Sequence, residues 1–345
     1  MLRAPKVRSL RFLLVSIAVF AIACEQAWTL DRQASTSATQ TKSAAVPLAE
    51  AARLYSESQE LYHQGAYDKA QGSGERALQL REQALGPDQP DVAAALSLLG
   101  RIADGKADFS RAAALYQRAL AIDEKALGKD DLAVADVLDG QAGDFTAIAK
   151  YPEAEEAGKR ALQIRETKLG ANDFLVAQSL ETLANLYGER SEFVKAESVA
   201  SRALAITTQL YGPDDLRTAD AEKWVGKVAI GRSNFGRAEE LLTHASKIKL
   251  AAAGENSLIY AESLADLSSL YLVKRDNLRA EQLAEQAQSM EEKLLGPDHL
   301  KVAVMLHNRG LIAYRRRDFG TSEKLYQRSL AIKKRCWGRS IRGMG

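Results

Sequence analysis

The chain has 345 residues, of which 46% are hydrophobic and only 6% aromatic, with seven prolines and two cysteines. This composition excludes a disordered chain and a disulfide-framed one, and fits a helical protein rich in Ala and Leu. The formal net charge of +2 hides an uneven distribution, because both ends are basic and the long stretch between them is acidic.

The N-terminus has the pattern of a targeting signal. A basic stretch at residues 3–11 precedes an apolar run at 12–23. The run is too short for a membrane span of about 20 residues, but it suits the core of a signal peptide. Ala21 and Ala23 form a small-residue cleavage pattern. We predict a signal peptide over residues 1–23 and export to the periplasm or cell envelope. The alternative is an uncleaved anchor, or a tail without targeting meaning.

Cys24 follows the predicted cleavage site directly. The stretch AIAC around it resembles a bacterial lipobox, although Ala21 stands where Leu is usual. Lipidation of Cys24 would tether the protein to a membrane. Residues 24–47 are dominated by Ser, Thr, Ala and Gln, which predicts a disordered tether. We interpret the second cysteine, Cys336, as a packed thiol in the last helix rather than a redox group.

From residue 48 onward one pattern recurs at a constant interval. A glycine closes each copy, at Gly86, Gly128, Gly170, Gly212, Gly254, Gly296 and Gly338. This period of about 42 residues lies within the range of roughly 20–50 residues that indicates a solenoid or a propeller. Leu96, Leu99 and Ala103 lie on one face of a helix, and Ala112 and Ala119 lie on one face of the next. Each copy is therefore expected to form a pair of helices.

Small residues at one position of each copy would allow the two helices to approach closely. They are Ser58, Gly100, Ala142, Ala184, Gly226, Ser268 and Gly310. Aromatic residues anchor the turn between the paired helices at Tyr67, Phe109, Tyr151, Phe193, Phe235 and Phe319, and Asn277 interrupts this series. The sequence thus predicts an all-α fold of antiparallel helix pairs.

The stretch between two copies reads as a helix stop followed by a helix start. In REQALGPDQPDVA, residues 81–93, we expect Gly86 to end a helix in the left-handed conformation. Pro90 is tolerated in the first turn of the next helix. The acids or amides two residues after each glycine are predicted to cap that helix. They are Asp88, Asp130, Asn172, Asp214, Asn256 and Asp298.

The pattern of Gly100, Phe109, Ala112 and Ala119 resembles the tetratricopeptide repeat, and the 42-residue period resembles the longer variant in kinesin light chains. The resemblance covers residues 48–338. It implies a right-handed α-solenoid whose first helices line an inner groove that binds peptides or partner helices. The seven repeats would be 49–90, 91–132, 133–174, 175–216, 217–258, 259–300 and 301–338, followed by a basic tail at 339–345.

The third repeat departs from good helical composition. Gly140, Gly143 and Asp144 replace helix formers in its first helix, and each glycine costs about 1 kcal/mol relative to Ala. Because Ala142 and Phe145 keep the register, we expect a weakened helix that is still present. Neutral drift is favoured here over a local hinge.

The sequence contains no motif typical of catalysis or metal binding. HExxH, CxxC and P-loop patterns are absent, and the four histidines, His63, His244, His299 and His307, lie in separate repeats without metal spacing. His299 falls in a turn, where it caps a helix or is solvated. We predict a noncatalytic protein without metal or cofactor. An enzyme would need ionisable groups that the fold alone brings together.

The predicted binding site is the inner groove. Its candidate residues flank the small residue of each first helix: Tyr55, Gln59, Tyr62, Arg101, Asp136, Asp139, Gln178, Glu181, Asn185, Glu189, Asp220, Lys223, Lys227, Glu262, Ser269, His307 and Tyr314. By the resemblance, Asn185 would hold the backbone of a ligand. Acids lie beside Lys223 and Lys227, so the groove does not favour a ligand of one sign. Nucleic acid is not expected, because its sites are predominantly basic.

We therefore expect a scaffold that binds a protein or peptide partner. The alternative is a cytoplasmic adaptor or regulatory protein with an N-terminal membrane anchor. The basic end, residues 315–345, is interpreted as a solvated cap, with contact to anionic lipid or an acidic partner as the alternative. Because no polar capping helix follows Gly338, the last repeat is expected to expose apolar surface, which predicts self-association or a missing domain.

Overall fold

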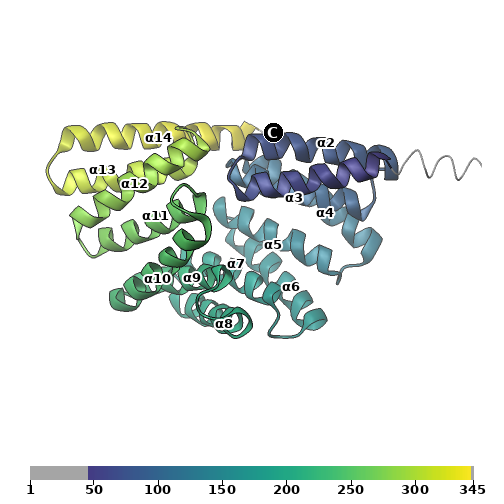
Figure 1. Ribbon diagram of the computed structural model, residues 1–345, viewed down its shortest axis with the longest axis horizontal. Coiled ribbons are helices and arrows are strands. Elements are labelled where there is room, and N and C mark those ends of the chain that lie inside the picture. Colours follow the sequence, from purple (N-terminus) through teal and green to yellow (C-terminus); the bar gives the residue numbers. More distant parts are fainter. Residues whose placement is uncertain (1–45, 343–345) are drawn as a thin grey trace, which may run out of the picture.

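The computed structural model describes residues 46–342, with side chains described as far as Cys336, and is built of α-helices joined by short turns (Figure 1). Residues 46–63 form the first helix. Helices α2 to α14 span Tyr67–Leu85, Pro90–Gly105, Phe109–Leu127, Leu132–Ala147, Tyr151–Leu169, Phe174–Glu189, Phe193–Tyr211, Leu216–Gly231, Phe235–Ala253, Leu258–Val273, Asn277–Leu295, Leu300–Arg315 and Phe319–Arg342. The predicted signal, Cys24 and most of the tether lie outside the described residues.

Each odd-numbered helix is the first helix of a repeat and packs against the even-numbered helix that follows it. The small-residue positions lie at these contacts, as predicted. A Cβ atom on Gly100 would lie 2.7 Å from the Tyr116 ring, and one on Gly226 would lie 2.8 Å from Leu242. Ser58 instead donates a hydrogen bond to the carbonyl oxygen of Ala70 at 2.7 Å. The result is a right-handed α-solenoid of stacked helix pairs.

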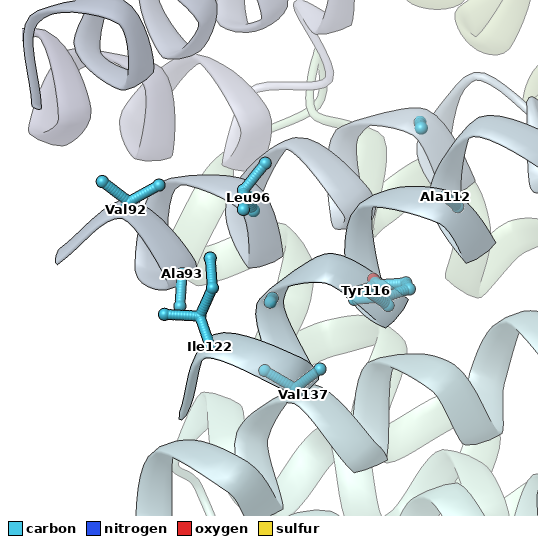
Figure 2. Packing of buried hydrophobic residues seen from close by; sticks show 9 residues of the cluster. Val92, Ala93, Leu96, Ala112, Tyr116, Ile122 and Val137 are labelled. Atoms are coloured by element: carbon cyan, nitrogen blue, oxygen red, sulfur yellow. The ribbon is translucent and has the colours of Figure 1, made fainter. Parts of the chain in front are cut away.

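Neighbouring repeats share a continuous core. In Figure 2, Val92 and Leu96 of α3, Tyr116 and Ile122 of α4, and Val137 of α5 form one buried cluster. Tyr116 is fully buried between the second and third repeats. Apolar burial of this kind stabilises a solenoid through contacts between adjacent units, since one helix pair alone has too little core.

The turn between repeats differs from the prediction in its backbone. Gly86 has φ 88° and ψ 165°, and the next five loop glycines share this conformation. This region is nearly restricted to glycine, whereas the expected left-handed helical region also tolerates Asn. The requirement for glycine is therefore stricter than predicted. Gly338 does not end a helix, because α14 continues to Arg342. Ser340 stands where earlier repeats have Asp or Asn.

The predicted helix caps were wrong by one residue. Asp131 caps α5 by accepting a hydrogen bond from the backbone N–H of Ala133 at 2.9 Å, and Asp173 and Asp215 cap α7 and α9 in the same way. Asp88 instead forms an ion pair with Lys125, at 2.9 Å. The other predicted capping residues do not cap either; the capping positions are Gln89, Asp131, Asp173, Asp215, Ser257 and His299.

The first helix of the third repeat is present, as predicted, and spans Leu132–Ala147. Drift, however, does not account for Gly140. A Cβ atom there would lie 2.5 Å from the buried Tyr116 ring, so the glycine is needed for close packing. Gly143 has open space around its Cα and shows no such requirement. The two glycines of this helix thus have different origins.

The solenoid curves until its last repeat meets its first repeats (Figure 1). Ala107 and Phe109 share a buried cluster with Val302, Leu306 and Ile332, and α14 contacts α4. We call this contact between the two ends the seam. Cys336 is buried in the same cluster, which confirms the packed thiol. Seven repeats therefore complete one closed turn within the described residues.

His299 joins the two sides of the seam. Its Nε2 atom lies 2.6 Å from the carbonyl oxygen of Gly105, and its ring stacks on Tyr67 with centroids 6.1 Å apart. Its Nδ1 atom accepts a hydrogen bond from the backbone N–H of Lys301, which makes His299 the cap of α13. Both contacts together require a neutral ring with the proton on Nε2.

Acid is expected to loosen the seam through His299. Burial lowers the pKa of His299; the Gly105 carbonyl and Glu262 oppose this lowering, and Lys301 adds to it. Since the closed form favours the neutral ring, its stability falls as the pH drops below about 6.5, by about 1 kcal/mol once the cap is lost. Amide hydrogen exchange at residues 65–69 and 105–109 should rise between pH 7.5 and 5.5, after correction for the intrinsic rate.

The matched variants are His299→Gln and His307→Gln. Glutamine at position 299 does not titrate, so the pH response should shrink there. His307 lies within α13 but is exposed, and its ring packs at an angle against Tyr326 rather than against Gly105 or Tyr67, so exchange at the seam should respond in its variant as in the parent protein. An unchanged pH response in His299→Gln would show that another group controls the seam.

The last repeat keeps exposed apolar surface beyond the seam. Tyr314 and Phe319 are 57% and 59% exposed, and Leu330 is 51% exposed. The expectation of exposed apolar side chains is confirmed, although Ile332 is covered by the seam itself. Self-association remains a prediction. Within residues 46–342, no helix combines the length and apolar character needed to cross a membrane.

Candidate functional site

Two adjoining pockets lie on the first helices of repeats four to seven. The first, which we call the Glu291 pocket, has a volume of about 240 Å³ and is lined by Lys223, Trp224, Lys227, Glu262, Ala265, Asp266, Glu291, Lys301, Val304 and Met305. The second, the Asn185 pocket, has about 120 Å³ and is lined by Ala184, Asn185, Gly188, Glu189, Phe193, Trp224, Lys227 and Val228. Because Trp224 and Lys227 border both, the two pockets lie side by side, and we call them together the hollow.

Trp224 is the central side chain of this hollow. The ammonium groups of Lys223 and Lys227 lie 4.6 and 4.7 Å from the centre of its ring, close enough for cation–π attraction. Trp224 also lies beside Glu181, where it acts to lower the pKa of that carboxyl group. A half-buried indole held in this way offers a flat apolar wall to an occupant, with charged groups at its margin.

Ionisable side chains link α7, α9, α11 and α13 along the inner face. Burial raises the pKa of Glu181 to about 7, and Lys223 opposes this rise. Burial also raises the pKa of Glu291 to about 7, against the effect of Lys301. Burial acts in the same direction on Glu262, but Lys301, its ion-pair partner, and Lys223 outweigh it and hold the pKa below its usual value. The inner face thus holds strong ion pairs beside two carboxyl groups that titrate near neutrality.

Five of the predicted groove residues line the hollow: Asn185, Glu189, Lys223, Lys227 and Glu262. Two more lie beside it, since Asp220 and Glu181 both act on Lys223. Asp220 also forms an ion pair at 2.8 Å with the buried Lys249. The central part of the predicted groove is therefore brought together by the fold.

Asp136 and Asp139 have a different role. Both form ion pairs with the buried Arg165, and Asp139 also accepts a hydrogen bond from Ser179 at 2.8 Å. Their carboxylates already compensate a buried guanidinium, which is costly to leave unpaired. We interpret them as structural links between the third and fourth repeats rather than groups free for a partner, in contrast to the sequence-based assignment.

The remaining candidates lie away from the hollow. Tyr55 packs under Arg81, and Tyr62 packs against Tyr67. His307 packs at an angle against Tyr326, and Ser269 donates to the carbonyl oxygen of Ala265. Gln59 is half-buried, whereas Arg101, Gln178 and Tyr314 are exposed. None of them lines the two pockets.

Sequence reasoning missed seven lining residues of the Glu291 pocket: Trp224, Ala265, Asp266, Glu291, Lys301, Val304 and Met305. Trp224 lies between two residues that were selected, and its aromatic character in a predicted groove was a usable signal. Glu291 and Lys301 could not be found in this way. One lies on a second helix and the other in the first turn of α13, outside the positions considered. No group of three or more metal-binding side chains occurs among the described residues.

Stacked helix pairs that share a core with their neighbours define a helical repeat solenoid. The chain belongs to the tetratricopeptide repeat family, whose sequence model matches residues 50–125, 112–167, 175–251 and 260–335. A search of curated proteins gives no significant match.

Several solved structures share the fold. A Rap protein complexed with competence and sporulation factor has a TM-score of 0.67 at 16% identity, covering 84% of this chain and 76% of that one. The apo form of RapI has a TM-score of 0.59 at 15% identity, with 83% and 98% covered. A putative kinesin light chain of Podosopora anserina gives 0.44 at 16% identity, with 57% and 94% covered. At these identities the first two structures show a likeness of fold alone, and the third score is too low to establish one.

Proposed function

We propose that the protein is a noncatalytic scaffold that binds a peptide, or an extended segment of a protein partner, on its inner face. The observation that carries this proposal is the hollow on both sides of Trp224. It combines an aromatic wall, an amide at Asn185 and ammonium groups at Lys223 and Lys227. Such a mixture suits a polypeptide, which presents backbone amides and varied side chains.

The fold comparison supports the same kind of ligand. One similar structure, the Rap protein, is a complex with competence and sporulation factor. Stacked repeats provide an extended concave surface suited to such a ligand. We carry over only the class of partner, a peptide or protein, because the sequences share 16% identity.

Substitutions in the hollow should weaken partner binding. The full chain, immobilised and incubated with extract of its source, is crosslinked to captured partners, and affinity is then measured with the purified partner. Asn185→Ala removes a hydrogen-bonding amide and Lys227→Glu reverses a charge, so each should reduce affinity about tenfold or more, as expected for a central contact.

The controls make the same two kinds of substitution at exposed positions outside the hollow. Asn172→Ala alters an exposed turn, and Lys247→Glu alters an exposed position on α10, so both should bind as the parent does. If the two hollow variants kept full affinity, the inner face around Trp224 would not be the binding site.

We further propose that the protein is exported and acts at the cell envelope. The basic and apolar N-terminal stretch and Cys24 motivate this location. Mass spectrometry of the mature protein should show loss of residues 1–23, with an added lipid mass on Cys24 if it is acylated. An intact N-terminus in a cytoplasmic fraction would favour the alternative, an adaptor with an N-terminal anchor.

A further inference from the structure

Glu291 is a buried carboxyl group at the wall of the hollow. The residue is 2% exposed, and its Oε2 atom has no hydrogen-bond partner in the protein. It projects from α12 into the pocket formed by α9, α11 and α13. Burial of a carboxyl group without a partner is costly. A ligand group that donates to Glu291 would remove this cost.

The charges around Glu291 leave room for a cation. Lys301 is engaged by Glu262, and Lys249 is engaged by Asp220. Lys223 is surrounded by four acids, Asp220, Glu262, Asp266 and Glu181. Since Asp220 and Glu262 already have partners, Asp266 and Glu181 are left to offset its charge. Lys227 is exposed, and its ammonium group lies over the Trp224 ring at the margin of the pocket.

Burial keeps the Glu291 carboxyl group partly protonated near neutral pH. Burial, together with the charges of Glu262 and Asp266, raises the pKa of Glu291 to about 7 although Lys301 opposes the rise. A cation that entered the pocket would reverse the balance and favour the carboxylate. Binding of a cationic ligand would therefore be coupled to loss of a proton from Glu291.

The walls of the pocket suit a long aliphatic stem. Trp224, Val304, Met305 and Ala265 line it beside the charged groups, and its volume is about 240 Å³. Lysine and arginine side chains combine an apolar stem with a charged head, and they bury the stem while the head finds a charged partner.

We propose that the Glu291 pocket is a specificity site for a lysine or arginine side chain of the bound segment. The stem would lie against Trp224 and Met305, and the ammonium or guanidinium group would donate to Glu291, with Asp266 beside it. This inference rests on the proposed function, since it assigns one side chain of the segment that crosses the inner face. The adjoining Asn185 pocket would hold the neighbouring part of that segment.

A peptide series tests the pocket directly. The full chain is titrated with acetyl-Ala-Ala-X-Ala-Ala-amide, where X is Arg, Lys, Gln, norleucine or Glu. The indole N–H signal of Trp224, assigned with Trp224→Phe, reports binding by NMR. We expect the Arg and Lys peptides to bind about tenfold tighter than the Gln and norleucine peptides. Tightest binding of the Glu peptide would reverse the proposal.

Glu291→Gln separates this site from the rest of the groove. The variant keeps the shape and removes a buried acid, so it should fold and should bring all five affinities within about twofold. Glu285→Gln, on the same helix but outside the pocket, is the control. If Glu291→Gln preferred the Arg and Lys peptides over the Gln and norleucine peptides as strongly as the parent does, the assignment would be overturned.

The pH dependence of the affinity gives a second measurement. Affinity for the Lys peptide should rise about tenfold from pH 6 to pH 8 in the parent, because Glu291 must ionise, and should stay nearly constant in Glu291→Gln. Binding of all peptides without preference would remove the cation site but leave the inner face as a peptide site. Absence of any Trp224 shift, with unchanged partner binding in Asn185→Ala, would count against both.

Discussion

Replacement of Gly140 by alanine is expected to destabilise the protein by about 1–2 kcal/mol, although alanine is the better helix former. The added Cβ atom would lie 2.5 Å from the ring of Tyr116, which is fully buried between the second and third repeats. A ring held on all sides cannot move aside, so the helices must separate. Overpacking of this kind costs about 1–3 kcal/mol or more, which exceeds the gain in helix propensity of about 1 kcal/mol.

Gly143→Ala is the matched comparison on the same helix. Nothing lies within 4 Å of the position that its Cβ would take, so only the backbone term remains and stability should rise by about 0.5–1 kcal/mol. Urea unfolding followed by circular dichroism measures both changes. If the two variants shifted stability in the same direction, packing against Tyr116 would not be what keeps Gly140.

Asp144→Asn is expected to stabilise the protein by about 2 kcal/mol at pH 8, because the variant has no buried carboxyl group to ionise at this position. Burial raises the pKa of Asp144 to about 6. Burial, and then the charge of Asp144, raise the pKa of Asp104. Asp104 also accepts a hydrogen bond from Tyr116 at 2.7 Å. The folded protein must keep a proton between two buried carboxyl groups, and asparagine removes that requirement.

The pH dependence identifies the cause. A raised carboxyl pKa means that the folded state binds more protons than the unfolded state, so the stability of the parent falls as the pH rises from about 4 through 6 and beyond. The advantage of Asp144→Asn should therefore vanish near pH 4. Urea unfolding at several pH values tests this, with Glu156→Gln, an exposed acid on α6, as the control. A gain in stability that did not change with pH would point to packing instead.

Much of the fold was predictable because each feature recurs with the same period along the chain. The aromatic residue at Phe109, the small residue at Gly100 and the glycine at Gly86 mark local needs: a helix start, a close approach and a backbone conformation. Because the same pattern recurs in seven repeats, an irregular residue in one repeat does not obscure the fold. The helix that contains Gly140 was also expected, because its register agreed with that of the other repeats.

Predictions about individual polar side chains were less successful. Asp88 and Asp131 both lie in turns between repeats, yet one forms an ion pair and the other caps a helix. They stand two and three residues after the loop glycine, and the helix cap falls at the second of these positions in every repeat. Both positions are rich in Asp, so composition alone did not show which of the two adopts the cap conformation. Asp139 was assigned to the groove from its place on a first helix, and its pairing with Arg165 has no local sequence signal.

The hollow was predictable only where it follows the first helices. Asn185, Lys223 and Lys227 were found because their spacing repeats along these helices. Glu291 enters from a second helix, and its pKa depends on how neighbouring repeats pack together. Such features depend on the curvature of the solenoid. This curvature is the sum of small rotations between repeats, so it cannot be derived from the sequence of any single repeat.

The seam alters how the chain is expected to fold. An open solenoid makes contacts only between neighbouring units, so it unfolds from its ends in steps. The hydrogen bond between His299 and Gly105 joins residues 194 positions apart, and the cluster around Phe109 and Ile332 ties the same two ends together. Closing so long a loop slows folding, but it leaves no free end at which fraying can begin. Loss of either terminal repeat should therefore weaken the other, and the ring should unfold as a single cooperative unit.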